Sequence, residues 1–131
     1  MIDQTHSKNV EELKMVKLFV GFKFWFEAEN KYAFGEGAFK LLEAISKSHS
    51  LVKAAESVDM SYRYAWGIIR KIEETIKTPV ATSYRGGKDG GGRSDLTETG
   101  RLLLQSYKTV KNDFKNLSEK YSRQLQETLR E

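Results

Sequence analysis

Side chains that can bind phosphates and base edges are concentrated between residues 60 and 93. This stretch holds seven cations and three anions, and seven minus three equals the formal net charge of +4 of the whole chain. An arginine fork matches guanine O6 and N7 in a bidentate pair, and both arginine and lysine neutralise phosphates. The stretch therefore predicts a nucleic-acid interface. Its cations are Arg63, Arg70, Lys71, Lys77, Arg85, Lys88 and Arg93, and its anions are Glu73, Glu74 and Asp89.

Catalytic and metal-binding chemistry have weaker support in the sequence. The chain has no cysteine, its histidines are His6 and His49, and no acidic cluster has the spacing of metal ligands. The glycine-rich stretch 86–92 lacks the Gly-Lys-Ser/Thr ending that opens the helix after a phosphate-binding loop. We therefore predict no enzymatic activity, no metal site and no cofactor.

Two helical patterns position the cations. A first helix is predicted over 51–58 and a second over 61–77, with Ser50 and Ser61 as their N-caps and residues 59–60 as the turn. This arrangement is a helix-turn-helix. The buried face of the second helix is predicted from the intervals of four, three and four residues that separate Ala65, Ile69, Ile72 and Ile76.

The opposite face of the second helix is predicted to bind DNA. Gly67 lies at its centre, where a bare helix surface could approach a base pair or sugar closely; the alternative is a tolerated surface glycine. Trp66 is predicted to be a core or hinge residue rather than a wedge between bases. We expect Arg63 to read a guanine. The predicted DNA-binding residues of this helix are Ser61, Tyr62, Arg63, Tyr64, Gly67, Arg70 and Lys71.

A two-stranded hairpin is predicted after the second helix. Pro79 ends that helix, because proline disfavours helical geometry in the preceding residue and cannot donate the next backbone hydrogen bond. Strands over 80–85 and 93–96 then flank a basic, glycine-rich tip at 86–92. Together these elements predict a winged helix. The predicted phosphate-binding residues of the hairpin are Arg85, Lys88 and Arg93.

Upstream of the helices, apolar and polar residues alternate. This pattern predicts a strand over 17–27, a turn at 28–30 and a second strand over 31–34, followed by a helix over 36–47. A lone two-stranded hairpin is only marginally stable in water. We therefore expect its aromatic side chains to pack on the domain or on a second subunit.

The C-terminal segment is predicted to be one long helix with Thr97 as its N-cap. Its apolar residues recur at alternating intervals of four and three, which is the heptad spacing of paired helices. The pattern predicts a homodimer; the alternative is that the helix folds back on its own core. The predicted dimerisation residues are Leu103, Tyr107, Val110, Phe114, Leu117 and Tyr121.

The predicted fold class is mainly α with a small β component. We divide the chain into a flexible segment at 1–15, a DNA-binding domain at 16–100 and a dimerisation helix at 101–131. The longest apolar run, 18–26, is interrupted by glycine and lysine and is too short to span a membrane, and no signal peptide precedes it. We therefore expect a cytoplasmic protein without a membrane partner.

Several motifs follow one another in a fixed order: Phe34-Gly35-Glu36-Gly37, Leu42-Glu43-Ala44-Ile45, Ala54-Ala55, Met60-Ser61-Tyr62-Arg63 with Ala65-Trp66, and Arg85-Gly86-Gly87-Lys88 through Gly90-Gly91-Gly92 to Leu96-Thr97-Glu98-Thr99-Gly100. The stretch that carries them, about 22–107, resembles the N-terminal DNA-binding domain of the ModE family of molybdate-responsive transcription regulators, a relative of the LysR-type winged helices. The departures from the family pattern are Asp59, Gly67 and Asp89.

This resemblance implies a homodimer that places helix 61–77 in the major groove of double-stranded DNA and the wing 85–93 on the backbone. It does not imply molybdate binding, which in the family belongs to separate C-terminal domains, so no molybdate is expected. We therefore predict a sequence-specific transcription regulator. The alternatives are a non-specific architectural DNA-binding protein and a winged-helix module that binds other proteins.

Overall fold

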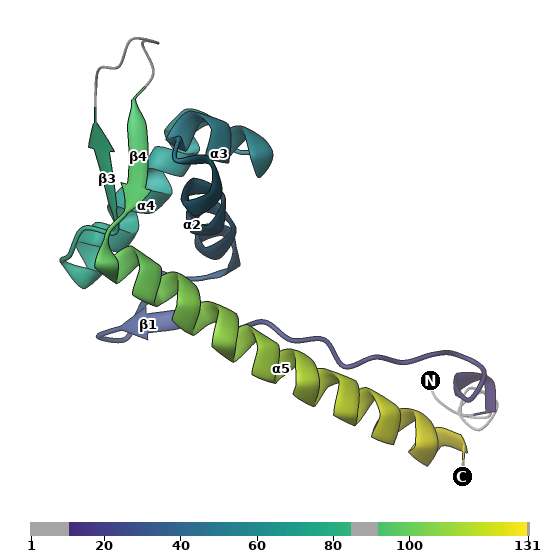
Figure 1. The fold of residues 1–131 in the computed structure, drawn as a ribbon. Helices are drawn as coiled ribbons and strands as arrows, with labels where there is room; N and C mark the ends of the chain where they lie inside the picture. Colours follow the sequence, from purple (N-terminus) through teal and green to yellow (C-terminus); the bar gives the residue numbers. More distant parts are fainter. Residues whose placement is uncertain (1–10, 85–91, 131) are drawn as a thin grey trace, which may run out of the picture. The chain divides into compact units, whose positions relative to one another are not determined.

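The structure is a computed structural model that describes residues 11–84 and 92–130. It is mainly helical with two small antiparallel sheets, which confirms the predicted fold class. The chain divides into two compact units, Phe24–Thr109 and a second one made of Met1–Lys23 with Val110–Glu131. Along the chain the elements are β1 (Phe26–Ala28), β2 (Lys31–Phe34), α2 (Glu36–Ser48), α3 (Leu51–Ser57), α4 (Tyr62–Ile76), β3 (Ala81–Tyr84), β4 (Arg93–Leu96) and α5 (Glu98–Arg130), as Figure 1 shows.

Helices α2, α3 and α4 form the centre of the larger unit and pack on one another beside the β3–β4 hairpin (Figure 1). Each begins and ends within one residue of its predicted position. On α2, Leu41, Leu42 and Ile45 are fully buried, as their helical spacing predicts. The apolar periodicity therefore identifies the face of each helix that builds the core.

The first hairpin is shorter than predicted. Its turn is confirmed, since Glu29 and Asn30 both have positive φ, 51° and 65°, as a two-residue turn between twisted strands requires. The predicted strand over 17–27 is wrong, however, because regular pairing begins only at Phe26. Alternation shows that one face of a segment is apolar, but a strand also needs a neighbouring strand to accept its backbone hydrogen bonds.

An aromatic cluster joins this hairpin to the rest of the larger unit. Its centre is Tyr107 of α5, which is 1% exposed. The Tyr107 hydroxyl donates a hydrogen bond to Glu36 Oε2 at 2.9 Å, and burial together with this carboxylate raises the pKa of Tyr107. The rings of Phe24, Phe26, Phe34 and Phe39 surround it at centroid distances of 4.3, 5.6, 5.5 and 4.9 Å. The aromatic hairpin thus packs on its own domain.

This cluster corrects part of the predicted dimer seam. A side chain that its own unit already buries has no surface to offer a partner, so the prediction does not hold for Tyr107. Leu103, one turn earlier, is partly buried against the same core. For the other seam residues, Val110, Phe114, Leu117 and Tyr121, dimerisation stays a prediction.

The second hairpin is anchored at its base by several backbone contacts. Helix α4 ends at Lys77, whose φ is 59°, and the chain then turns at Pro79. Val80 is fully buried, and its N–H donates to Glu73 Oε2 at 2.8 Å. Strands β3 and β4 pair from Ala81 opposite Leu96 to Tyr84 opposite Arg93.

The turn from β4 into α5 completes this anchor. The Thr97 N–H donates to the Val80 carbonyl at 3.0 Å, and the Thr97 hydroxyl accepts from the Gly100 N–H at 3.0 Å, which confirms the predicted cap. A Cβ at Gly100 would collide with the Val80 carbonyl oxygen. The close approach of two backbones therefore requires glycine here.

In the smaller unit, the segment 16–22 runs alongside the C-terminal half of α5 (Figure 1). The rings of Phe22 and Phe114 stack with their centroids 5.6 Å apart. Most of the segment predicted as flexible, 1–15, lies outside the described residues; residues 11–13 are helical. Among the residues that the structure describes, no helix is both long and apolar enough to cross a membrane.

Candidate nucleic-acid interface

Helices α3 and α4 are joined by a tight turn whose backbone groups are satisfied locally. The hydroxyl of Ser50 accepts from the Lys53 N–H, and that of Ser61 accepts from the Tyr64 N–H, both at 3.1 Å, so the two predicted N-caps are confirmed. Asp59, in the predicted turn, adopts a left-handed conformation with φ of 57°, which aspartate tolerates better than most residues. These local bonds fix where α4 begins, and hence which residues occupy its first turn.

Small side chains let the two helices lie close together. Ala54 and Ala55 of α3 and Ala65 of α4 are buried, with exposures of 0, 1 and 0%. Ile69 and Ile72 continue the buried face of α4, at 8 and 3% exposure. Because this face is held in the core, the opposite face of α4 is turned to solvent.

The exposed face of α4 carries every residue that the sequence predicted for it. Its first turn has no acidic residue, so the partial positive charge of the helix N-terminus is not neutralised and favours an anion such as a phosphate. An open groove follows this face and is lined by Ser61, Arg63, Tyr64, Gly67, Ile68 and Lys71. Tyr62 and Arg70 are also exposed.

Gly67 lies at the centre of this groove. No heavy atom lies within 4 Å of the position that a Cβ would occupy there. Neither core packing nor backbone geometry of the described residues therefore demands a glycine, and the helix surface is bare at this position.

Arg70 is held partly by its neighbours on α4. Its guanidinium carbon lies 4.9 Å from the centroid of the Trp66 ring, and one of its nitrogens lies 3.7 Å from Glu74 Oε1. Both partners are exposed, and such surface pairs are weak. Arg70 can therefore exchange these contacts for a phosphate at little energetic cost.

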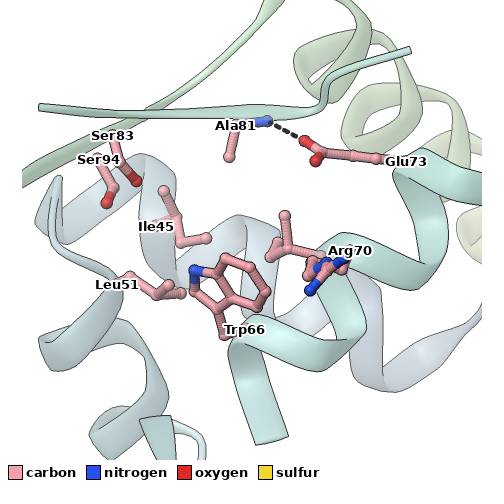
Figure 2. Close-up of a pocket in the computed structure, with 9 residues that line it drawn as sticks. Ile45, Leu51, Trp66, Arg70, Glu73, Ala81, Ser83 and Ser94 are labelled. Carbon is pink, nitrogen blue, oxygen red and sulfur yellow. Dashed lines mark hydrogen bonds between the residues drawn. The ribbon is translucent and has the colours of Figure 1, made fainter. Parts of the chain in front are cut away.

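A small cavity lies between α4 and the β3–β4 hairpin. Figure 2 shows Trp66 and Arg70 of α4 next to each other on one side of it, and a hydrogen bond from the Ala81 N–H to Glu73. Ser83 and Ser94 line the side formed by the strands. The volume is about 230 Å³, below the roughly 300–1,000 Å³ of typical ligand sites. We therefore attribute the cavity to imperfect packing between helix and hairpin.

At the end of the strand pair next to the glycine-rich tip, Arg93 is engaged by an acidic partner. Asp95 Oδ2 accepts from Arg93 Nε at 2.9 Å, and its Oδ1 lies 2.8 Å from His49 Nδ1. The hydrogen bonds from Arg93, and then those from His49, hold the pKa of the Asp95 carboxyl below its usual value. The His49 carbonyl also accepts from the Ser94 N–H at 2.9 Å, which ties the α2–α3 link to β4.

Comparisons with known proteins identify several relatives of this chain. The chain is 30% identical over 95 residues, 72% of its length, to the "Molybdenum transport protein ModE" of Azotobacter vinelandii. It is 33% identical over 85 residues to the "Molybdenum-pterin-binding protein MopB" of Rhodobacter capsulatus, and 34% identical over 67 residues to the "DNA-binding transcriptional dual regulator ModE" of Escherichia coli K12. The chain is a relative of ModE. No protein-family model matches it.

The similarity to ModE covers only part of each relative. The aligned residues span 35% of the Azotobacter protein, 31% of the Rhodobacter protein and 25% of the Escherichia coli protein. The chain therefore spans about a third or less of the length of these ModE and Mop proteins. The names of these relatives, which refer to transcription regulation or to molybdenum, describe the full-length proteins.

Two of the residues predicted to bind DNA cannot be placed, and two residues near Arg93 were not predicted from the sequence. Arg85 and Lys88 lie outside the described residues. His49 and Asp95 were not predicted to take part. The Arg93–Asp95 pair could have been inferred, because residues two apart on a strand point to the same face, whereas nothing in the sequence indicates that His49 lies beside them.

Proposed function

We propose that this chain contains a winged helix-turn-helix domain of the ModE type and acts as a homodimeric, sequence-specific regulator of transcription. In this proposal α3 and α4 form the helix-turn-helix, α4 enters the major groove, and the β3–β4 hairpin is the wing. The observation that carries it is the exposed, acid-free N-terminal turn of α4 in a chain related to a protein named as a DNA-binding regulator. Such a turn suits contact with base edges and phosphates.

The exposed residues of α4 that the sequence predicts to bind DNA each have a role in the proposal. Arg63 is the main base reader, because its fork can pair with guanine O6 and N7. Ser61, Tyr62 and Tyr64 contact neighbouring bases and phosphates, while the bare surface at Gly67 lets the helix approach the groove closely. The residues proposed to neutralise phosphates are Arg70, Lys71, Arg85, Lys88 and Arg93.

A homodimer fits the surface of α5 in the smaller unit. Phe114, Leu117, Tyr121 and Leu125 are 37, 47, 48 and 37% exposed. A row of half-exposed apolar side chains at helical spacing is typical of a surface that a partner covers. Two copies would then present their α4 helices to half-sites about one helical turn, roughly 10 base pairs, apart.

The decisive experiment is selection of duplexes from a random DNA library at physiological salt, followed by sequencing of the bound pool. We expect an inverted repeat with half-sites about 10 base pairs apart to be enriched. Retention of DNA without an enriched sequence would support the non-specific architectural alternative, and failure to retain DNA would favour a protein partner. Repeating the selection with molybdate added tests the expectation that binding does not depend on this anion.

A further inference from the structure

The segment 16–22 is held against α5 along one backbone edge. Its backbone groups bond with side chains of the helix rather than with another strand: the Leu18 N–H donates to Gln126 Oε1 at 2.8 Å, the Val20 N–H donates to Ser122 Oγ at 2.8 Å, Gln126 Nε2 donates to the Val16 carbonyl at 3.2 Å, and the Ser118 hydroxyl donates to the Val20 carbonyl. All of these contacts use even-numbered residues of the segment. Its extended conformation is thus fixed by helix side chains.

The other backbone edge of the segment is free. In an extended chain the backbone groups of successive residues point to opposite edges. Those of Lys17, Phe19 and Gly21 therefore point away from α5, and within residues 11–84 and 92–130 none of them has a hydrogen-bond partner. These three residues are the free edge of the segment. Such an unpaired edge is a template for pairing with another chain.

Exposed apolar side chains lie on the segment and on the helix beside it, although Glu119, Arg123 and Arg130 also line the groove along the segment. Phe19 is 77% exposed, and nothing lies within 4 Å of a Cβ built at Gly21. On α5, the half-exposed Leu117, Tyr121 and Leu125 directly precede the three residues that bond with the segment, Ser118, Ser122 and Gln126. Edge strands that must stay unpaired are usually protected by charges, proline or a covering element. Of the three residues of the free edge, Lys17 alone has a charged side chain, and none is proline.

We propose that the free edge pairs with the same edge of a second copy, so that two extended segments form an antiparallel ribbon across the dimer axis. The inference rests on the proposed homodimer and names the element that builds it. In an antiparallel pair, directly opposed residues exchange both backbone hydrogen bonds at every second position. The free edge offers donors and acceptors at this spacing.

The register follows from the positions of the free groups. Pairing Phe19 with Phe19 of the second copy places Lys17 opposite Gly21, so all three residues of the free edge find a partner. If the register moves by two residues toward the C-terminus, Lys17 lies opposite Lys23, so one residue of the free edge no longer pairs with another. Like charges directly opposite each other also destabilise a ribbon. Phe19 therefore lies on the two-fold axis.

Proline at Gly21 tests the backbone pairing. The Gly21→Pro variant removes one N–H of the free edge while leaving the N–H groups of Leu18 and Val20 bonded to α5. We expect it to raise the dimer dissociation constant, measured by sedimentation equilibrium, at least about tenfold, as the loss of two symmetric hydrogen bonds of about 1 kcal/mol each would do. Gly21→Ala keeps the N–H and has room for its methyl group, so it should dimerise like the wild type.

A cysteine at the axis tests the register. The chain has no cysteine, so Phe19→Cys introduces a single thiol, about 5.5 Å in Cα distance from its symmetry mate and within disulfide range. We expect it to form a covalent dimer on mild oxidation. Lys23→Cys is the control, since its symmetry mate would be eight residues, roughly 27 Å, away along the ribbon.

The outcomes separate this inference from the proposed function. Wild-type dimers that Gly21→Pro leaves unchanged, together with no cross-link through Phe19→Cys, would overturn the ribbon while leaving a dimer formed by α5 alone. A wild type that stays monomeric would overturn both the ribbon and the dimer. DNA selection with the same preparations tests sequence-specific binding independently of dimerisation, because a monomer would still enrich a single half-site.

Discussion

Asp95 Oδ2 accepts a hydrogen bond from Arg93 Nε at 2.9 Å, and its Oδ1 accepts a second from Arg93 Nη2 at 3.2 Å. The two residues alternate along β4 and share one face of the hairpin. Arg93 is thus held by an acid at the tip end of the paired strands of the proposed wing. In the proposed complex, a DNA phosphate would compete with Asp95 for this guanidinium.

Replacing Asp95 by asparagine should therefore strengthen binding to any duplex. The Asp95→Asn variant removes the competing charge and leaves Arg93 free to neutralise a phosphate. We expect affinity to rise for specific and random duplexes alike, and the slope of log affinity against log salt to become steeper by about 1. Asp113→Asn makes the same change in net charge at an exposed position of α5 in the smaller unit. Equal effects of the two substitutions would show that Asp95 acts only through net charge.

Arg63→Ala should reduce the preference for one base of the DNA site more than it reduces the total affinity for DNA. Loss of a bidentate pair with guanine costs about 1–3 kcal/mol at one base position. Sequences selected by the variant should accordingly lose their preference at that position and keep it elsewhere. Lys40→Ala, at an exposed site on α2, removes one cation outside the proposed interface and should leave the selected sequence unchanged. A variant that selects the wild-type sequence in full would remove Arg63 from the role of base reader.

Gly67→Ala should change the stability of the protein and its DNA affinity in opposite directions. Because nothing lies near the added methyl group, the substitution should raise the free energy of unfolding by roughly 1 kcal/mol, while the bulk at the centre of the proposed interface lowers DNA affinity. Gly37→Ala on α2 is a matched exposed helical site and should stabilise without changing DNA binding. Affinity that is unchanged or higher in Gly67→Ala would make Gly67 a tolerated surface glycine.

The raised pKa of Tyr107 predicts a loss of stability at alkaline pH. An unfolded tyrosine titrates near pH 10, whereas burial and Glu36 keep native Tyr107 protonated above that pH. Below pH 10 both states hold the proton and the full contribution is present. Above pH 10 the unfolded state releases the proton while the native state retains it, so the free energy of unfolding falls as pH rises.

Urea unfolding of the wild type and of Tyr107→Phe between pH 8 and 11 measures this contribution. At pH 8 the variant should be less stable by roughly 1–3 kcal/mol, the range for a hydrogen bond to a charged group. The difference should shrink above pH 10, since the variant lacks the group that titrates. Tyr62→Phe, at an exposed position of α4 outside the core and the proposed dimer surface, should leave the stability at pH 8 unchanged. If the free energies of unfolding of wild type and Tyr107→Phe change in parallel with pH, the loss of stability at alkaline pH does not come from Tyr107.

The sequence by itself determined the local structure. The caps at Ser50, Ser61 and Thr97 and the left-handed turn at Asp59 depend on bonds within three or four residues of one another. Spacing of apolar residues likewise identified the buried face of α4, because helix geometry alone decides which side chains share a face. Both kinds of signal are complete within a short window of the chain.

Only the tertiary structure decided which partners those faces meet. A heptad of apolar residues looks the same whether its partner is another chain or its own core, and the aromatic rings around Tyr107 placed that residue in the core. Alternation over 17–27 showed an apolar face but could not show that α5, a hundred residues later, supplies the hydrogen bonds. His49 and Asp95 meet across 46 positions for the same reason. Short-range geometry is encoded locally, whereas the choice of a distant partner depends on how the whole chain packs.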